Sequence, residues 1–468
     1  MFDDEEQVNE FFEGSLKEDL EKFESFLKGE TIGFFDTDRW EAMIDHYLIA
    51  AKYSKALLCV EEALTQFSYS PLFKLRKAQA LSATGNLKEA LNLLTEIERS
   101  DVPSMEVLLS KASVFSQLKD TKNAIKYFKG AIIEAAPEDR DEIYLDLAME
   151  YQNNDEYQLA INVLIEAVNA NKSNEGAIYE LAYCYDQIGD TEKSIQCYSD
   201  FIDDNPYSFT AWYNLGNAHS KLENHEKALW AYDYCILIND DFGPAYFNLG
   251  HTSLSLNRYT KAIEYFEKCM ELDGDDPLAL CYIGECHEQL NQLELARHYY
   301  KRSLELAPML PDSWLGLGIV EDMEGNTQEG LTLILKASEL DPDNPSIYHV
   351  LAGAYEKLEE RDKAIEYYEM SLNLDANEEE CLLNYVDFLS TESNQVALDY
   401  LEMFEEINSG NALFNVLKVS VLWKLGHSER SIELFKYCLT IDRDKALELF
   451  EINPALKNVS EFVLLSDQ

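Results

Sequence analysis

The sequence predicts an all-α protein, a right-handed α-solenoid superhelix of about twelve helix-turn-helix repeats of 34 residues. Three observations predict this class: a small residue recurs at nearly constant spacing, large apolar residues flank it at helical spacing, and proline and glycine fall between the predicted helices. The 468 residues are also too many for a single hydrophobic core. A stack of repeats instead buries apolar residues between neighbours.

The small residue is alanine in most copies, and a large side chain there would force two crossing helices apart. Successive copies are 33 to 36 residues apart, most often 34. The twelve positions are Ala56, Ala90, Ala124, Ala160, Ser194, Ala228, Ala262, Ala296, Gly330, Ala364, Ala397 and Ser431. We therefore expect two antiparallel helices to cross at each position.

Large apolar residues lie 16 positions before and four positions after the small residue in most copies. Trp212 and Tyr232 flank Ala228 in this way. Spacings of three and four place such residues on one face of a helix, so they predict the buried face of each repeat.

Proline and glycine mark the ends of the predicted helices. Ten of the eleven prolines lie at or beside a repeat boundary, where a helix accepts them in its first turn or just past its end. Gly85, Gly189, Gly325 and Gly426 each stand five residues before a small residue. Glycine there can adopt the left-handed conformation that ends the first helix of a repeat.

The pattern W-x2-L-G…A-x3-F/Y…P resembles the tetratricopeptide repeat, and residues 209–242 read FTAWYNLGNAHSKLENHEKALWAYDYCILINDDF. The resemblance covers about 410 residues. The predicted organisation is N-terminal capping helices at 1–36, degenerate repeats at 37–140, seven in-register repeats at 141–378, degenerate repeats at 379–443 and a C-terminal cap at 444–468.

Both ends carry patterns typical of solenoid caps. Residues 15–28 begin with a capping box of Ser15 and Glu18, and Gly29 is expected to stop that helix. At the other end a short helix precedes Pro454 and a final apolar run. Residues 2–14 are acidic, so a disordered interaction tail is the alternative for that segment.

The charge favours polypeptide partners over other classes. The chain has 88 acidic and 38 basic residues, a net charge of −50, which repels nucleic acids and anionic membranes. Basic or neutral polypeptides are favoured, with solubility alone as the alternative role for this charge. No run of eighteen apolar residues occurs, the N-terminus is acidic, and the nine cysteines have no regular spacing, so we expect a cytoplasmic protein.

The sequence predicts no catalytic, cofactor-binding or metal site. Cys281, Cys286 and His287 form C-x4-C-H, but residues five apart on a helix diverge, and Cys286 falls at a packing position of the repeat. We expect these cysteines to be buried and structural. Neither a metalloprotease motif, a nucleophile motif nor a glycine-rich phosphate loop stands out, so the sequence predicts a protein that is not an enzyme.

The resemblance implies that the first helix of each repeat lines a concave groove that binds peptides or helices of partner proteins. With Trp212 as position four, the groove positions are five, six, nine and twelve of each first helix. The predicted partner-binding residues are Tyr179, Tyr183, Asp186, Tyr213, Asn214, Asn217, Phe247, Asn248, His251, Glu285 and Glu288. For the aromatic residues among them, packing between neighbouring repeats is the alternative.

The favoured function is a scaffold or adaptor that binds a basic or neutral peptide or helix, with aromatic rings supplying contact area and carboxylates favouring Lys or Arg. Chaperone-binding members of the family carry Lys and Arg on this face, whereas Tyr213, Asn217, Phe247 and His251 occupy those slots here. The alternatives are a self-associating structural scaffold and, third, a small-ligand sensor. Replacing Tyr213 and Phe247 by alanine is expected to weaken partner binding without loss of helicity.

Overall fold

The computed structural model describes residues 15–100, 104–408 and 410–466, and every regular element in those ranges is a helix. The contacts divide the chain into two compact units, one ending at Asn239 and the other beginning at Asp240. Within the described ranges, no helix has both the length and the apolar character needed to cross a membrane.

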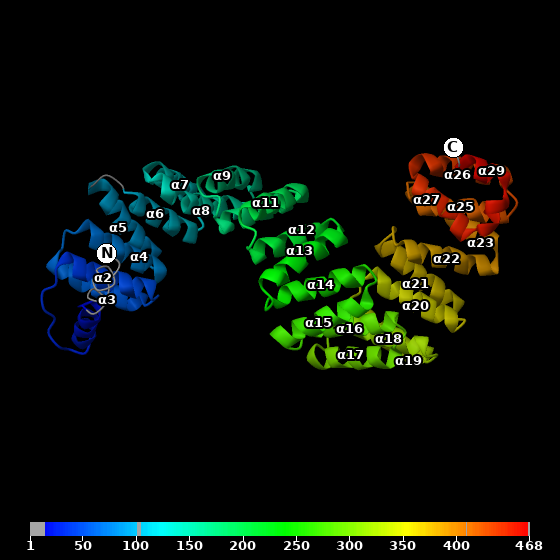
Figure 1. The fold of residues 1–468 in the computed structure, drawn as a ribbon, viewed down its shortest axis with the longest axis horizontal. Helices are drawn as coiled ribbons and strands as arrows, with labels where there is room; N and C mark the ends of the chain where they lie inside the picture. Colours follow the sequence, from blue (N-terminus) through cyan, green and yellow to red (C-terminus); the bar gives the residue numbers. More distant parts are fainter. Residues whose placement is uncertain (1–14, 101–103, 409, 467–468) are drawn as a thin grey trace. The chain divides into compact units, whose positions relative to one another are not determined.

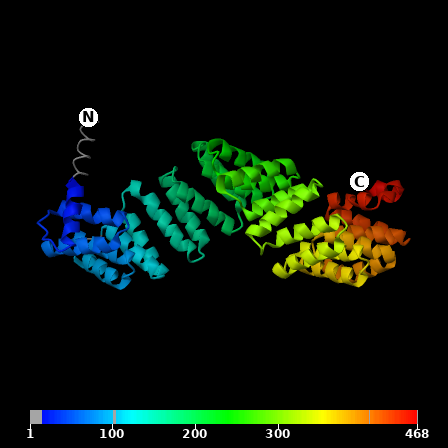
Figure 2. The ribbon, with the colours of Figure 1, turned by 90° about the horizontal axis from the view of Figure 1, so that it is seen from below.

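The first compact unit contains six antiparallel helix pairs, in each of which the two helices lie side by side (Figures 1 and 2). The first helices are α2 (Thr37–Ile49), α4 (Pro71–Ala83), α6 (Met105–Gln117), α8 (Arg140–Gln152), α10 (Glu175–Gln187) and α12 (Phe209–Lys221). The second helices are α3 (Tyr53–Gln66), α5 (Leu87–Ser100), α7 (Thr121–Glu134), α9 (Tyr157–Ala170), α11 (Thr191–Asp204) and α13 (His225–Ile238). A 3₁₀ turn, η1 (Pro137–Asp139), precedes α8.

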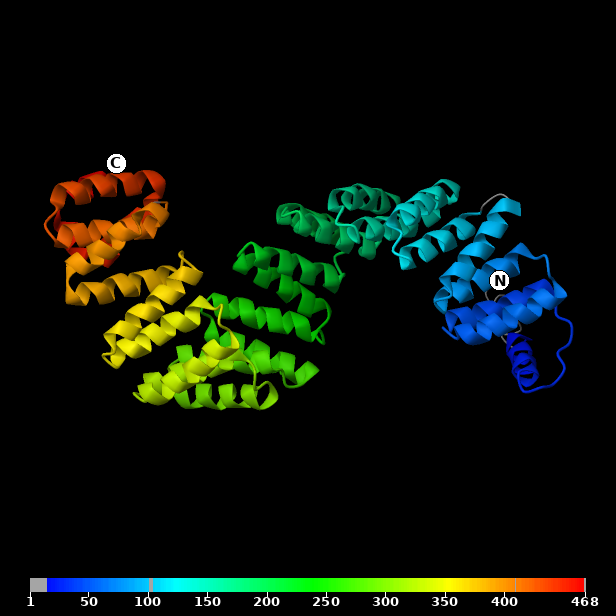
Figure 3. The same cartoon turned by 180° about the vertical axis from the view of Figure 1, so that it is seen from behind.

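The second compact unit contains six more pairs (Figure 3). The first helices are α14 (Gly243–Ser255), α16 (Pro277–Gln289), α18 (Pro311–Met323), α20 (Pro345–Lys357), α22 (Glu379–Glu392) and α25 (Ala412–Lys424). The second helices are α15 (Tyr259–Asp273), α17 (Leu293–Leu306), α19 (Thr327–Leu340), α21 (Arg361–Leu374), α23 (Asn394–Met403) and α26 (Ser428–Ile441). The short elements are α24 (Glu405–Asn408), α27 (Arg443–Leu447), α28 (Leu449–Ile452), η2 (Pro454–Asn458) and α29 (Ser460–Ser466). The α-solenoid of about twelve repeats that the sequence predicts is thus confirmed.

The small residues lie where the sequence pattern placed them. All twelve are buried, including the serines Ser194 and Ser431 and the single glycine Gly330. Each lies near the start of the second helix of its pair, where that helix packs against the first. The recurring small residues therefore lie at the points where the two helices of each pair approach closely.

The turn within a repeat uses one left-handed residue five positions before the small residue. Glycine fills it in four repeats, as predicted, with φ between 78° and 88°. Seven other repeats place a non-glycine residue there with φ between 53° and 60°: Ala51, Lys119, Asp155, Glu223, Asn257, Asn291 and Glu359. The exception is the repeat of Ala397, in which Ser393 is extended and caps α23 directly, shortening the spacing by one residue.

Glycine substitution at these strained turns is expected to stabilise the protein. A left-handed β-carbon costs about 1 kcal/mol, so Glu359→Gly should raise the free energy of unfolding by about 0.5–1 kcal/mol. The measurement is urea denaturation followed by circular dichroism. Gly325→Ala, at the equivalent turn with φ 88°, is the matched control and should change stability in the opposite direction. If the free energy of unfolding changes in the same direction in both variants, the left-handed residue at 359 is not strained.

Both ends of the chain cover the outer repeats. The helix at residues 15–26 places Phe23, which is fully buried, at 6.2 Å from the ring of Trp40. Gly29 has φ 104°, as expected of the residue that ends this helix. At the other end, the ring of Phe462 lies 5.1 Å from that of Phe435. The interaction tail predicted as the alternative for residues 2–14 lies outside the described residues.

Candidate functional site

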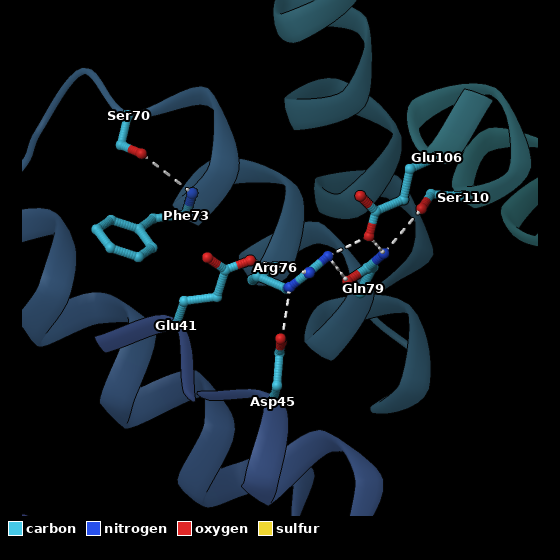
Figure 4. Close-up of polar contacts among 8 residues, drawn as sticks. All are labelled: Glu41, Asp45, Ser70, Phe73, Arg76, Gln79, Glu106 and Ser110. Carbon is cyan, nitrogen blue, oxygen red and sulfur yellow. Dashed lines mark hydrogen bonds and ion pairs between the residues drawn. The ribbon is translucent and has the colours of Figure 1, made fainter. Parts of the chain in front are cut away.

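Arg76 of α4 joins the first helices of three successive repeats (Figure 4). Its guanidinium lies 2.7 Å from Asp45 and 3.4 Å from Glu41, both on α2, and it also pairs with Glu106 of α6. The Arg76 side chain is only 13% exposed. One cation therefore faces three carboxylates, and the network holds three neighbouring helices at a fixed spacing.

Amide side chains continue this network along the same face. Gln79 donates to Glu106 at 3.2 Å and to Ser110 at 3.3 Å (Figure 4). Gln117 of α6 donates back to Ser82 of α4 at 2.9 Å. Because both glutamines bridge α4 and α6, they line up polar groups along the space between the two helices.

The starts of these helices are fixed by local sequence. Ser70 accepts a hydrogen bond from the backbone N–H of Phe73 at 3.4 Å and caps α4, whose first residue is Pro71 (Figure 4). Ser104 caps α6 in the same way by accepting from Val107 at 3.4 Å. Each cap sets where its helix begins and therefore which residues face the shared surface.

A pocket of about 530 Å³ opens beside this network on α4, α6 and α8, which we call the first-helix pocket. Its lining residues are Ala78, Gln79, Ser82, Ala83, Leu109, Ser110, Ser113, Ser116, Gln117, Phe128, Asp146, Met149, Glu150 and Asn153. The lining provides hydroxyl, amide and carboxylate groups with a few apolar surfaces, and it contains no lysine or arginine.

The carboxylates of α8 give this pocket a negative potential. Burial raises the pKa of Asp146, and the nearby charges of Glu142 and Glu150 raise it further. Glu150 is buried and accepts a hydrogen bond from Ser116. Met149 adds an apolar side chain that is 46% exposed. The pocket therefore offers acceptors, negative charge and a small apolar contact area.

Two of the predicted aromatic residues lie on α10. The Tyr179 hydroxyl donates to Thr210 of the next repeat, so this side chain links neighbouring repeats, which was the alternative expected from the sequence. Tyr183 keeps 47% of its surface exposed, and its ring lies 6.4 Å from that of Tyr157 on α9. Tyr183 is thus the more accessible of the two.

Asp186, also on α10, forms an ion pair with Lys221, 35 residues later in the sequence. The second compact unit repeats this pair with Asp322 and Lys357, which lie 2.5 Å apart. In both cases a carboxylate at position twelve is neutralised by the following repeat. Asp186 is therefore already paired with a lysine of its own chain.

The predicted residues of α12 divide between packing and the half-buried surface. The Tyr232 hydroxyl of α13 donates to the Asn217 side chain at 2.8 Å, and the ring of Tyr213 lies 5.9 Å from that of Tyr232. Tyr213, Asn214 and Asn217 are all half-buried. These three residues lie together on one helix face, as their spacing predicts.

On α14 the aromatic residue packs between repeats. The ring of Phe247 lies 5.6 Å from that of Phe266 and 6.0 Å from that of Tyr282 on α16. The exposed His251 contacts Tyr282 from the edge, with ring centroids 5.4 Å apart, and Asn248 is half-buried. Phe247 therefore joins two helix pairs, as the packing alternative anticipated.

The predicted acids of α16 are the most electrostatically perturbed of the set. Burial and the charge of Asp312 raise the pKa of Glu285. Burial raises the pKa of Glu288 to about 7, opposed by a hydrogen bond from Tyr300 at 2.9 Å. The residue 35 positions after Glu288 is Met323, so Glu288 lacks the lysine that neutralises the equivalent aspartates. Glu288 therefore holds its proton close to neutral pH.

This raised pKa predicts a pH-dependent stability. The folded protein keeps a proton on Glu288 that the unfolded chain releases above its ordinary value of 4.5, so stability falls as pH rises from 4.5 to about 7. Glu288→Gln should remove this loss and stabilise the protein at pH 8 by about 2 kcal/mol, with little effect at pH 4.5. Urea denaturation at the two pH values measures it.

The equivalent repeat supplies the control for that measurement. Glu356 of α20 accepts a hydrogen bond from Tyr368 at 3.1 Å, as Glu288 does from Tyr300, but Glu356 is exposed. Glu356→Gln should change stability by less than about 0.5 kcal/mol at both pH values. A similar gain in both variants would show that burial of Glu288 is not the cause.

The residues predicted to bind a partner begin at Tyr179, so they do not include the first-helix pocket, whose lining lies between residues 78 and 153. The same count applied to earlier repeats reaches Gln79, Ser82, Ser110, Ser113, Ser116, Asp146 and Met149, all of which line the pocket. The repeat register therefore contains the information that predicts this pocket. The residues at its groove positions are mainly serine and glutamine and not aromatic residues.

One group in the described part of the chain has the donor atoms of a metal site. Single donor atoms of His349, Glu378 and Cys381 all lie within 4.8 Å of one another. Glu378 caps α22 by accepting from the Cys381 backbone N–H at 3.1 Å, and burial raises the pKa of the Cys381 thiol to about 12. Helix capping and core packing account for this group without a metal.

The cysteines singled out in the sequence are core residues. Cys281 and Cys286 are buried, and burial raises the pKa of each thiol to about 12. Such thiols are poor nucleophiles near neutral pH. The burial expected from the repeat register is confirmed for both.

Sequence profiles described as "Tetratricopeptide repeat" match residues 75–140, 141–174, 179–244, 243–276, 277–309 and 345–378. Together these matches cover more than half of the chain. The matched segments include all the residues that line the first-helix pocket.

A similar protein is the Tetratricopeptide repeat protein 30 homolog of Caenorhabditis briggsae, which is 24% identical over 156 residues. That match covers 33% of this chain and 23% of the relative, so it spans less than a quarter of the relative's length.

Two solved structures resemble the fold. The APC/C hetero-tetramer Cut9–Hcn1 shares 15% identity over 83% of this chain and 90% of that chain, with a TM-score of 0.43. YrrB, described as a TPR protein with an unusual peptide-binding site, shares 23% identity over 40% of this chain and 95% of that chain, with a TM-score of 0.31. These likenesses concern the fold alone.

Proposed function

The chain belongs to the tetratricopeptide-repeat family, and we propose that it is a non-catalytic scaffold that binds a basic or neutral polypeptide segment on the first helices of its repeats. Tetratricopeptide repeats are generally protein-interaction scaffolds. The observation that carries this proposal is the first-helix pocket on α4, α6 and α8.

The lining of this pocket suits an extended or helical polypeptide. Serine hydroxyls at 110, 113 and 116 and the amides of Gln117 and Asn153 can bond backbone N–H and C=O groups. Leu109 and Met149 provide apolar contact for one or two side chains. Backbone bonding of this kind gives affinity with little dependence on the ligand sequence.

Charge supplies the preference for basic segments. Asp146 and Glu150 line the pocket with no lysine or arginine among their neighbours there, and bringing such carboxylates together is unfavourable. A ligand lysine or arginine would relieve this repulsion and increase the association rate at low salt. In the second unit, Glu285 and Asp312 are likewise perturbed by burial and by other carboxylates, which supports the same preference.

The test compares polypeptides captured by the full chain and by a Ser113→Arg variant. Arginine at 113 would fill the pocket and repel a basic segment, so proteins bound through the pocket should be depleted about tenfold. They should also be depleted when the salt is raised from about 0.1 M to 1 M, because the Debye length falls from about 10 Å to 3 Å. Quantitative mass spectrometry of the captured proteins reads out both effects.

The matched control is Ser54→Arg, which adds the same charge at an exposed position of α3 outside the pocket. A second arm uses the Tyr213→Ala/Phe247→Ala double variant to test the residues predicted from the sequence. If the same proteins are captured by all variants, binding does not use these surfaces. If the chain captures only itself, a self-associating scaffold replaces this proposal.

A further inference from the structure

A second pocket, of about 670 Å³, lies between the second helices α17 and α19 and over α18, within the second compact unit. We call it the Trp314 pocket, and its lining residues are Lys301, Leu304, Glu305, Trp314, Leu317, Glu321, Glu329, Thr332 and Leu333. Its volume falls in the range of about 300–1,000 Å³ typical of ligand pockets. It uses positions four, seven and eleven of α18, not the groove positions five, six, nine and twelve.

Three other repeats, including the two adjacent ones, carry stacked rings at the equivalent positions. A side chain at position eleven of the first helix stacks there on a tyrosine three residues after the small residue of the second helix. The three stacked pairs are Phe115–Tyr127, His287–Tyr299 and Tyr355–Tyr367, with centroids 5.4, 5.3 and 5.2 Å apart and interplanar angles of 6°, 18° and 3°. The second and third pairs belong to the repeats on either side of the Trp314 pocket.

In the Trp314 repeat, both members of the stacked pair are replaced. Glu321 stands at position eleven and Leu333 at the tyrosine position, so neither ring is present. Glu321 forms an ion pair with Arg297 of α17 at 3.0 Å and accepts a hydrogen bond from the Asn326 side chain at 3.0 Å. The pocket is therefore lined at the two positions where the adjacent repeats carry their stacked rings.

The residue at the position of Trp314 is more buried in the two adjacent repeats, which keep the stacked pair. Leu280 is fully buried and Tyr348 is 7% exposed, whereas Trp314 is half-buried and forms part of the pocket lining. Its indole N–H is satisfied by the carbonyl of Pro308 at 2.9 Å, which fixes the ring orientation. A fixed and partly exposed indole is a good surface for stacking.

The rim of the pocket is acidic. Glu305 and Glu329 are exposed, and neither forms an ion pair among the described residues, while the single cation of the lining is Lys301. An aromatic side chain entering from a partner would therefore be accompanied favourably by a neighbouring Lys or Arg.

We infer that the Trp314 pocket is a second docking site, which binds a partner polypeptide segment that inserts an aromatic side chain beside a basic residue. The ring takes the place of the tyrosine found in the adjacent repeats, and the basic residue meets Glu305 and Glu329. This site is independent of the first-helix pocket, because the two lie in different compact units and on different helix faces.

The test is selection of random peptides of about 12 residues, displayed on phage, on the full-length protein at about 0.15 M salt. Enriched peptides are synthesised and their dissociation constants measured for the wild type and for Leu333→Tyr. That variant restores the ring of the adjacent repeats and should fill the pocket without loss of helicity. Peptides carrying an aromatic residue near a Lys or Arg should bind it at least about tenfold more weakly.

Two controls separate this site from other surfaces. Leu295→Tyr adds the same ring at an exposed position of α17 outside the pocket and should leave the dissociation constants within about twofold. Ser113→Arg, which blocks the first-helix pocket, should also leave them unchanged. If Leu333→Tyr lowers helicity, the Glu305→Lys/Glu329→Lys double variant replaces it, and basic peptides should again bind about tenfold more weakly.

Several outcomes would overturn the inference. They are enriched peptides that bind Leu333→Tyr as tightly as the wild type, enriched peptides without an aromatic residue, and no enrichment at all. A synthetic peptide of residues 1–14, which contains three phenylalanines but is acidic, tests the chain itself as the occupant. If that peptide binds the wild type but not Leu333→Tyr, the occupant of the Trp314 pocket is this chain's own segment and not a partner protein.

Discussion

A Gly330→Leu variant should lose about 3 kcal/mol of stability in the second compact unit. A β-carbon at this position would lie 2.5 Å from the backbone oxygen of Gly318 and 3.1 Å from the backbone nitrogen of Asp322. Both atoms belong to the backbone of α18 and cannot move aside without displacing the helix. Urea denaturation followed by circular dichroism measures the loss.

The control for this substitution is Gly353→Leu on α20, where a β-carbon would meet no atom within 4 Å. Leucine has a higher helix propensity than glycine, so this variant should gain up to about 1 kcal/mol. If Gly330→Leu lowers the free energy of unfolding and Gly353→Leu raises it, the close helix crossing at position 330 is the cause of the loss. A similar loss in both would mean that the approach of α19 to α18 is not what restricts position 330.

An Arg76→Gln variant is expected to destabilise the first compact unit by about 3 kcal/mol at pH 7. Removing one partner from a buried ionic network costs about 3–5 kcal/mol, and the lower end applies because the three carboxylates are between 34% and 44% exposed. The variant leaves Glu41, Asp45 and Glu106 facing one another. Hydrogen exchange of the amides in α2, α4 and α6 localises the effect.

The pH dependence of this loss distinguishes electrostatics from packing. Acidification protonates carboxylates in both proteins, so the difference between variant and wild type should shrink toward pH 4. Arg99→Gln, at an exposed position of α5, is the control and should change stability by less than about 0.5 kcal/mol. A loss for Arg76→Gln that is the same at pH 4 and pH 7 would indicate lost packing of the side-chain stem instead.

The sequence was informative about the fold because a repeat array depends on local spacing. The position of Ala228 relative to Trp212 and Tyr232 is set by the helical period and by the crossing of two helices that are adjacent in sequence. The same spacing recurs in most repeats, so the copies support one another as evidence for the register. This is why the helix pairs and the buried cysteines could be predicted.

The binding surfaces were harder to predict. Phe247 and Tyr179 occupy groove positions by count, yet their contacts with Tyr282 and Thr210 join neighbouring repeats. Whether a side chain at such a position faces solvent or the next repeat depends on the size of the residues one repeat further on. The period alone does not contain that information.

The sequence by itself determined the repeat, its register, the left-handed turns at four glycines and the strongly acidic composition. Only the tertiary structure decided where space remains open. The Trp314 pocket exists because Glu321 and Leu333, twelve residues apart, both lack the rings that fill the equivalent space in the adjacent repeats. The first-helix pocket likewise results from small polar side chains on three helices that are about 34 residues apart in sequence. A pocket is the volume left between side chains of several helices, so it depends on their packing together and not on any one of them.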